Sequence, residues 1–155
     1  MSEQSEIFKE GEKAPSFSLP NSHGEETSLE SLLDDKLLLY FYPKDSTPGC
    51  TKQACGYRDA YDDLDITIVG VSGDSVESHE RFKTNQSLPF MLLSDEHKTT
   101  IREYGVIGET QHFGKPTLTI KRTAFLIDKD GTIEKVWKDV DPEQHASQVK
   151  QYLEK

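Results

Sequence analysis

The sequence predicts an α/β fold in which a central mixed β-sheet is flanked by helices. Four apolar runs are too continuous for a half-exposed sheet and are typical of strands covered on both faces. These runs are Leu37 to Tyr42, Ile66 to Ser72, Phe90 to Ser94 and Ala124 to Asp128. Stretches of helical pattern lie between them, so strand and helix alternate along the chain, as in βαβ units.

The first predicted helix runs from about Cys50 to Leu64. The second is predicted to begin at Asp74, because Glu77 follows at the spacing of a capping box. Ahead of the first apolar run, the segment 17–29 has the pattern of a small β-hairpin with a His-Gly pair near its tip. The fold is therefore expected to carry an N-terminal β-hairpin.

The last apolar run is followed by Asp130-Gly131, a strong turn signal, and the alternating residues after it predict the second strand of a hairpin. A final helix is expected, with Asp141 as N-cap, Pro142 at the first helical position and Gln144 in the reciprocal capping place. Two βαβ units, a hairpin and a closing helix together predict a thioredoxin-like α/β sandwich.

Composition limits the classes of function. The length of 155 residues predicts a single domain over residues 1–155. The net charge of −10 would repel a phosphate backbone or an anionic membrane surface, so neither nucleic acid nor membrane is an expected partner. The sequence has no apolar run of membrane-spanning length and no secretory pattern at its start, which predicts a cytoplasmic protein.

The two cysteines lie in one short stretch, YPKDSTPGCTKQAC. Cys50 is expected where a strand has ended and a helix begins, and unpaired backbone N–H groups at a helix N-terminus favour the reactive thiolate. The alternative is that Cys50 is a small buried hydrophobic residue. A Pro-Gly loop at the carboxyl end of a strand faces solvent in α/β sheets, which favours the reactive interpretation.

Cys55 lies five residues after Cys50. On one ideal helix this separation places the Cα atoms roughly 8–9 Å apart. A disulfide needs Cα atoms within about 7 Å, so the two sulfurs can join only if the first turns of the helix unwind. That geometry suits a catalytic cycle and not a static crosslink, although Ala54-Cys55-Gly56 can also be read as small residues for close packing.

Other chemistries have little support in the sequence. Neither CxxC nor HxxxH spacing occurs, so we expect no metal. Nucleophile-elbow and phosphate-loop motifs are missing as well. The histidines are expected at the surface and have no catalytic spacing: His23, His79, His97, His112 and His145.

PKDSTPGC contains the pattern PxxxTxxC, with Pro43, Thr47 and Cys50 in the slots of the peroxiredoxin active-site motif. The longer run FYPKDSTPGCTKQACGYRD resembles the Q-type or bacterioferritin comigratory protein subfamily, in which a second cysteine five residues on is the resolving residue. The segment IKRTAFLIDKDGTI is similar to the one that brings the family's essential arginine, here Arg122. The resemblance covers nearly the whole chain.

This resemblance implies that Cys50 is the peroxidatic nucleophile and Cys55 its resolving partner. It implies that Thr47 hydrogen-bonds the thiolate and the peroxide, that Pro43 shields the pocket, and that Arg122 holds the thiolate and polarises the peroxide. It also implies an antioxidant peroxidase that needs no cofactor, acts on peroxides and is a monomer or weak dimer. From residue spacing alone, Arg122 could equally be a charged residue at the surface. The polar, glycine-containing segment 105–122 is expected to be a loop near the active site.

Three functions remain distinct. The first is a thiol peroxidase that reduces hydrogen peroxide and alkyl hydroperoxides, with thioredoxin or a similar dithiol donor as reductant. This function accounts for Pro43, Thr47, Cys50, Cys55 and Arg122. A thiol-disulfide oxidoreductase would normally have CxxC at the helix start, and the Cys-x4-Cys spacing argues against it. A non-enzymatic redox sensor could use the same sulfur chemistry.

Overall fold

A computed structural model gives the fold and describes residues 8–112 and 114–154. Its centre is a five-stranded mixed sheet in the order β5-β4-β3-β8-β9. Strand β3 pairs in parallel with β4 and antiparallel with β8. The strands are β3 (Leu37–Phe41), β4 (Thr67–Ser72), β5 (Met91–Ser94), β8 (Thr123–Ile127) and β9 (Ile133–Trp137). The predicted thioredoxin-like sandwich is confirmed.

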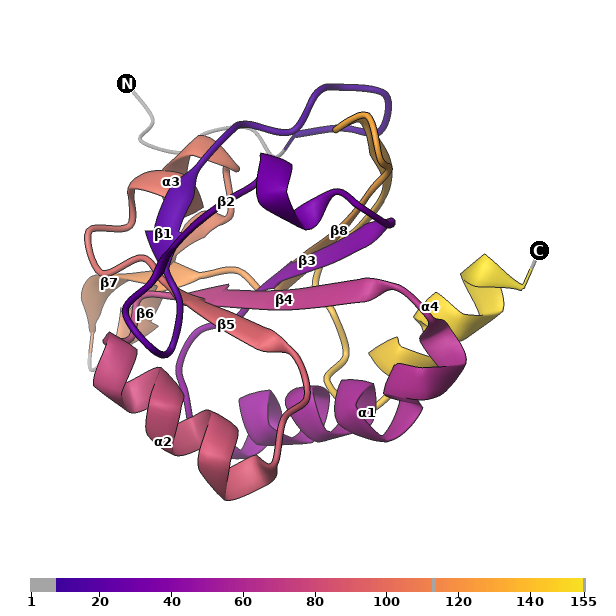
Figure 1. The fold of residues 1–155 in the computed structure, drawn as a ribbon. Coiled ribbons are helices and arrows are strands. Elements are labelled where there is room, and N and C mark those ends of the chain that lie inside the picture. The colour runs from indigo at the N-terminus through magenta and orange to yellow at the C-terminus, as the bar shows by residue number, and fades with distance from the viewer. Residues whose placement is uncertain (1–7, 113, 155) are drawn as a thin grey trace.

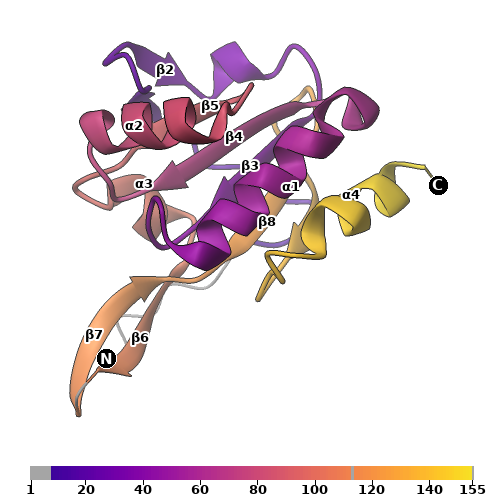
Figure 2. The same cartoon turned by 90° about the horizontal axis from the view of Figure 1, so that it is seen from below.

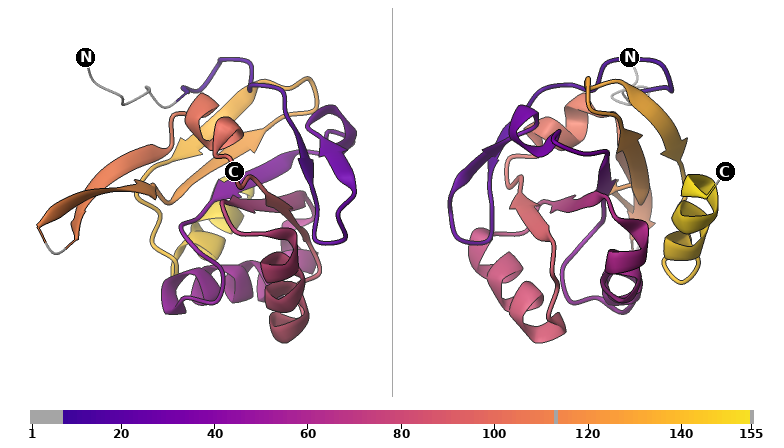
Figure 3. Two further views of the ribbon diagram at one scale, coloured as in Figure 1. Left: turned by 90° about the vertical axis from the view of Figure 1, so that its left-hand side faces the viewer. Right: turned by 45° about the vertical axis from the view of Figure 1, so that its right-hand side comes forward.

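The central strand β3 is buried along its whole length because both faces of the sheet are covered. Helices α1 (Pro48–Leu64), α2 (Val76–Gln86) and α4 (His145–Leu153) contribute to the core that includes Leu38 and Tyr40. The opposite face packs on the β1–β2 hairpin, the 3-10 helix η1 and α3, through Leu37, Leu39 and Phe41 (Figures 1 and 3). These elements are β1 (Ser18–Pro20), β2 (Glu26–Ser28), η1 (Glu30–Leu32) and α3 (Thr99–Glu103).

The four apolar runs form strands whose ends differ from the prediction by one residue at most. The N-terminal hairpin is confirmed, with β1 and β2 antiparallel. The turn between β8 and β9 is confirmed too, since Gly131 has a φ of 89° that favours glycine and donates its N–H to the Asp128 carbonyl.

The helix starts differ more from the prediction. Helix α1 begins at Pro48, so Cys50 is its third residue. The N-cap of α2 is Ser75, whose side chain accepts from the N–H of Ser78, because the Asp74 carboxylate accepts hydrogen bonds elsewhere. Helix α4 begins only at His145: Asp141 closes a turn before it instead of capping the helix itself.

The prediction of a polar loop over residues 105–122 is wrong. Strands β6 (Ile107–His112) and β7 (Lys115–Ile120) pair in antiparallel register from Ile107 with Ile120 to His112 with Lys115. Figure 2 shows this two-stranded arm projecting from the body of the molecule. The polar, threonine-containing residues that indicated a loop form a paired ribbon, of which residues 115–118 in β7 are exposed. Strand β7 leads directly to Arg122 and β8.

Candidate active site

Cys50 is held where β3 passes into α1. Thr47 is the N-cap in an extended conformation, and Pro48 takes the first helical position, where its missing N–H costs nothing. The next two N–H groups have no partner within the helix, and they give this end a partial positive charge. Cys50 is only 2% exposed, so its thiol is buried at this helix start.

Arg122 lies against the thiol. Its Nη1 donates to the Cys50 Sγ at 3.4 Å and to the Gln53 Oε1 at 2.7 Å. The guanidinium also covers Gly49, where an added Cβ would lie 3.2 Å from Nη2. Residues 72 positions apart in the sequence thus form a permanent cation beside a thiol at a helix N-terminus.

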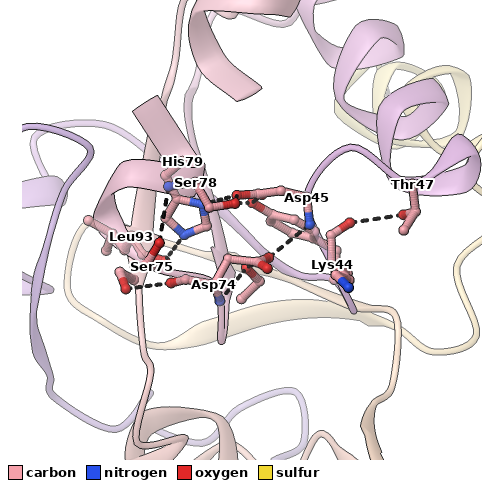
Figure 4. Close-up of polar contacts among 11 residues, drawn as sticks. Lys44, Asp45, Thr47, Asp74, Ser75, Ser78, His79 and Leu93 are labelled. Atoms are coloured by element: carbon pink, nitrogen blue, oxygen red, sulfur yellow. Dashed lines mark hydrogen bonds and ion pairs between the residues drawn. The ribbon is translucent and has the colours of Figure 1, made fainter. Parts of the chain in front are cut away.

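Thr47 and Pro43 are not hydrogen-bonded to the Cys50 thiol in the described part of the chain. The Thr47 hydroxyl donates to the carbonyl oxygen of Lys44 at 2.9 Å (Figure 4), and the residue is half-buried. Pro43 is exposed and follows Tyr42 just after the central strand. The structure therefore brings Cys50 and Arg122 together, and neither Thr47 nor Pro43 joins that hydrogen bond.

Cys55 is not in contact with Cys50. Both cysteines are free thiols on the same continuous helix α1, and Cys55 is half-buried. Its Sγ donates to the Gln86 Oε1 at 3.4 Å, at the end of α2. The ideal-helix separation of roughly 8–9 Å between the two Cα atoms therefore applies to this structure.

Sequence reasoning missed a chain of hydrogen bonds that continues from Arg122 into the protein. Gln53 accepts from Arg122 and donates its Nε2 to the Tyr57 hydroxyl at 2.8 Å. That hydroxyl is hydrogen-bonded to Nδ1 of His145, on α4. Cys50, Gln53 and Tyr57 are spaced i, i+3, i+7, which is one face of a helix, and this signal could have found the first part of the network.

A second missed cluster surrounds Asp45, in the loop between β3 and α1 (Figure 4). Its Oδ1 accepts from the Tyr42 hydroxyl at 2.6 Å, and its Oδ2 accepts from the Ser78 hydroxyl at 2.8 Å and from Nδ1 of His79 at 2.7 Å. The N–H of Asp45 donates to the Asp74 carboxylate at 2.8 Å. The expectation that His79 and His145 lie at the surface is wrong, because both rings are fully buried.

Within the described residues, Asp45, Asp74 and His79 are the one group with spacing suited to a metal ion, with candidate ligand atoms within 4.8 Å of one another. Each of these atoms already has a hydrogen-bond partner in the protein. The arrangement is accounted for as a hydrogen-bonded cluster that fixes the loop before Cys50.

The protein therefore belongs to a class with a thioredoxin-like fold and a buried thiol at the start of a helix, held beside an arginine. The sequence profile of the AhpC/TSA family matches residues 11–136. The putative peroxiredoxin Bcp of Coxiella burnetii is 48% identical over 142 residues, which cover 90% of this chain and 94% of the relative. Peroxiredoxin Bcp of Escherichia coli is 43% identical over 149 residues, covering 94% and 96%.

Among solved structures, the bacterioferritin comigratory protein of Xanthomonas campestris is similar with a TM-score of 0.83 and 36% identity, covering 89% of this chain and 90% of that one. The chain belongs to the AhpC/TSA family, as a peroxiredoxin of the Bcp or PrxQ type. It is accordingly an oxidoreductase that acts as a peroxidase.

Proposed function

We propose that this peroxiredoxin reduces hydrogen peroxide and organic hydroperoxides with Cys50 as the peroxidatic thiol. The observation that carries the proposal is the 3.4 Å contact from the Arg122 Nη1 to the Cys50 Sγ at the N-terminus of α1. The Xanthomonas relative is described for its alkyl peroxide reduction activity, which supports organic hydroperoxides as a substrate class.

In the first step the Cys50 thiolate attacks one peroxide oxygen and the O–O bond breaks. The sulfur is oxidised to a sulfenic acid, and the departing oxygen leaves as water or an alcohol after taking up a proton. Negative charge develops on that oxygen, so donors aimed at it lower the barrier. Arg122 supplies such donors, and the Thr47 hydroxyl turns from the Lys44 carbonyl toward the bound peroxide. Pro43 limits access of water at the rim.

In the second step the Cys55 sulfur attacks the Cys50 sulfenic acid, forming a disulfide and releasing water. Since both residues lie on the continuous helix α1, this bond requires the start of the helix to unwind. A dithiol donor of the thioredoxin kind then reduces the disulfide by exchange, and the enzyme returns to two thiols.

The proposal also covers the localisation, the oligomeric state and the domain organisation of the enzyme. We take the enzyme to be cytoplasmic, a monomer or weak dimer, formed as one domain over residues 1–155. Within the described residues no helix is long and apolar enough to cross a membrane. The net charge of −10 disfavours nucleic acid and anionic membrane surfaces as partners.

Peroxide consumption measured with and without a thioredoxin system tests the proposal. Cys50→Ser should abolish turnover, whereas Cys55→Ser should consume about one equivalent of peroxide per chain and stop as a sulfenic acid. A sulfenate-specific reagent should trap that species, which separates a stalled enzyme from one reduced directly by the donor. Normal cycling of Cys55→Ser with thioredoxin would remove Cys55 from the mechanism.

A further inference from the structure

Two buried histidines hold the chain on either side of the stretch that carries both cysteines. His79, on α2, hydrogen-bonds Asp45, five residues before Cys50. His145, on α4, hydrogen-bonds Tyr57, two residues after Cys55. The stretch between these two attachment points is residues 46–56, which includes the whole of the helical start that must unwind.

The attachment at Asp45 is a buried set of hydrogen bonds around one carboxyl group. Nε2 of His79 lies 2.9 Å from the Leu93 carbonyl oxygen, which can only accept, so this nitrogen carries a proton. Asp45 accepts from the hydroxyl groups of Tyr42 and Ser78, and its Oδ2 lies 2.7 Å from Nδ1 of His79. We name Asp45 with Tyr42, Ser78 and His79 the Asp45 clasp. The side chains of Asp45 and His79 are at most 2% exposed.

The attachment at Tyr57 is neutral and equally buried. Gln53 donates to the Tyr57 oxygen, so the Tyr57 O–H is free to donate to Nδ1 of His145. We name Tyr57 with His145 the Tyr57 clasp. Next to it, Gly56 packs at van der Waals distance from Ala146 of α4, and the Arg58 Nη1 donates to the Gln86 carbonyl of α2 at 2.8 Å. From residue 56 onward, α1 is therefore fastened to two other helices.

Between the clasps, Arg122 donates to Cys50 and Gln53, and Cys55 donates to Gln86. The other contacts of this stretch are weak. Ser46 has a φ of 64°, a left-handed conformation that is strained for a residue other than glycine and that unwinding releases. The Thr47 hydroxyl reaches only Lys44 of its own loop. Lys52 forms an ion pair with Glu143 at 2.9 Å, but both side chains are more than half exposed, so solvent screens it.

We propose that His79 and His145 are positioning residues that confine the unwinding of the catalytic cycle to residues 46–56. The inference rests on the proposed Cys50–Cys55 disulfide. When that bond forms, both clasps stay closed, Ser46 acts as the hinge on one side and Gly56 marks the limit on the other. Because the clasps fix both ends of a short unwound segment, the two sulfurs stay close to each other. After reduction, the same clasps let the segment refold with Cys50 beside Arg122.

The test is amide hydrogen exchange on the reduced and oxidised protein, read as the difference between the two states. In the parent protein, oxidation should speed exchange about tenfold or more within residues 51–60, because the N–H groups of residues 57–60 donate to carbonyls of residues 53–56 in the intact helix. Exchange in residues 42–45 and 61–64 should stay unchanged. Peptide mass mapping should find the Cys50–Cys55 bond in the same sample.

Two variants should move one boundary each. Asp45→Ala should extend the oxidation-dependent loosening toward residue 42 and leave the other boundary in place. Tyr57→Phe, which removes only a hydroxyl, should extend it into residues 61–64 and leave the first boundary in place. Tyr61→Phe on the same helix, and His23→Gln at an exposed histidine, are matched controls that should move neither.

The outcomes separate the inference from the proposed function. Faster amide exchange beyond both clasps in the oxidised parent protein would overturn the inference. It would leave the proposed disulfide cycle intact. Faster exchange in Tyr57→Phe to the same extent in both redox states would also overturn it, since that is the effect of a merely structural residue. Oxidised protein without a Cys50–Cys55 bond would refute the proposed cycle and the inference with it. If Asp45→Ala does not fold, the result for Tyr57→Phe decides.

Discussion

His79 and His145 are buried to the same degree, with rings that are 0% exposed, yet different numbers of hydrogen bonds hold the two rings. Nδ1 of His79 pairs with the Asp45 carboxyl group, and Nε2 donates to the Leu93 carbonyl. Nδ1 of His145 faces a hydroxyl, and Nε2 has no hydrogen-bond partner among the described residues. The His79 ring is therefore held at both nitrogens, and the His145 ring at one.

Equal burial of two histidines therefore does not mean that they are equally well attached. Burial disfavours the charged form of the ring, and it lowers the pKa of His145 to about 4. His79 lies 2.7 Å from a carboxyl group. The Asp45 clasp is thus a network around a carboxyl group and the Tyr57 clasp a neutral hydrogen bond, so we expect them to respond differently to substitution.

Removing the carboxyl group at the centre of the Asp45 clasp should have the largest effect. Asp45→Ala leaves Nδ1 of His79 and two hydroxyl groups without their buried partner, and it should lower the free energy of unfolding by about 3–5 kcal/mol. Urea denaturation at pH 7 measures this. Asp35→Ala, at an exposed aspartate, is the control and should stay within about 0.5 kcal/mol of the parent protein.

Asp45→Asn sharpens the same point. An amide can donate to Nδ1 of a neutral His79, so the hydrogen-bonded shape can survive without either charge. We expect a smaller loss than for Asp45→Ala, of about 1–3 kcal/mol. Equal losses for the two variants would mean that the charge, and not the hydrogen-bond geometry, holds the clasp.

Acid should weaken the neutral clasp. The pKa of His145 is lowered from 6.5 in the unfolded chain to about 4 in the folded one, so the folded state resists protonation. Stability from this group is complete above pH 6.5 and is lost as the pH falls toward 4, with a total of roughly 3 kcal/mol. Urea midpoints between pH 7 and pH 4 should fall less steeply in His145→Gln than in the parent protein. Parallel curves would argue against a neutral buried imidazole.

Two buried tyrosines on the same side of the sheet give the smallest effects and the closest comparison. Tyr57→Phe removes a hydroxyl that joins Gln53 to His145, and it should cost about 1–2 kcal/mol. The Tyr40 hydroxyl has no hydrogen-bond partner among the described residues, so Tyr40→Phe should be within about 1 kcal/mol of neutral or stabilising. Thermal unfolding of the two variants in parallel checks that Tyr57→Phe loses more stability than Tyr40→Phe.

Much of the fold could be predicted because its signals are local. A strand covered on both faces reads as a continuous apolar run, and β3 is one. The polar arm β6–β7 could not be recognised, because residues 115–118 of β7 are exposed and the segment has no continuous apolar run. The start of α2 was misplaced since Asp74 and Ser75 are both good N-caps, and only the tertiary contacts of Asp74 with Asp45 and Ser72 decide between them.

The sequence by itself determined the position of Cys50 at a helix start and the distance that separates it from Cys55, since both follow from helix geometry along one short stretch. Only the tertiary structure decided what surrounds that stretch. Arg122, His79 and His145 come from elements that are distant along the chain, and sheet order and helix packing bring them to Cys50, Asp45 and Tyr57. A buried polar group needs a partner wherever the chain supplies one, and residue spacing along the sequence does not contain that information.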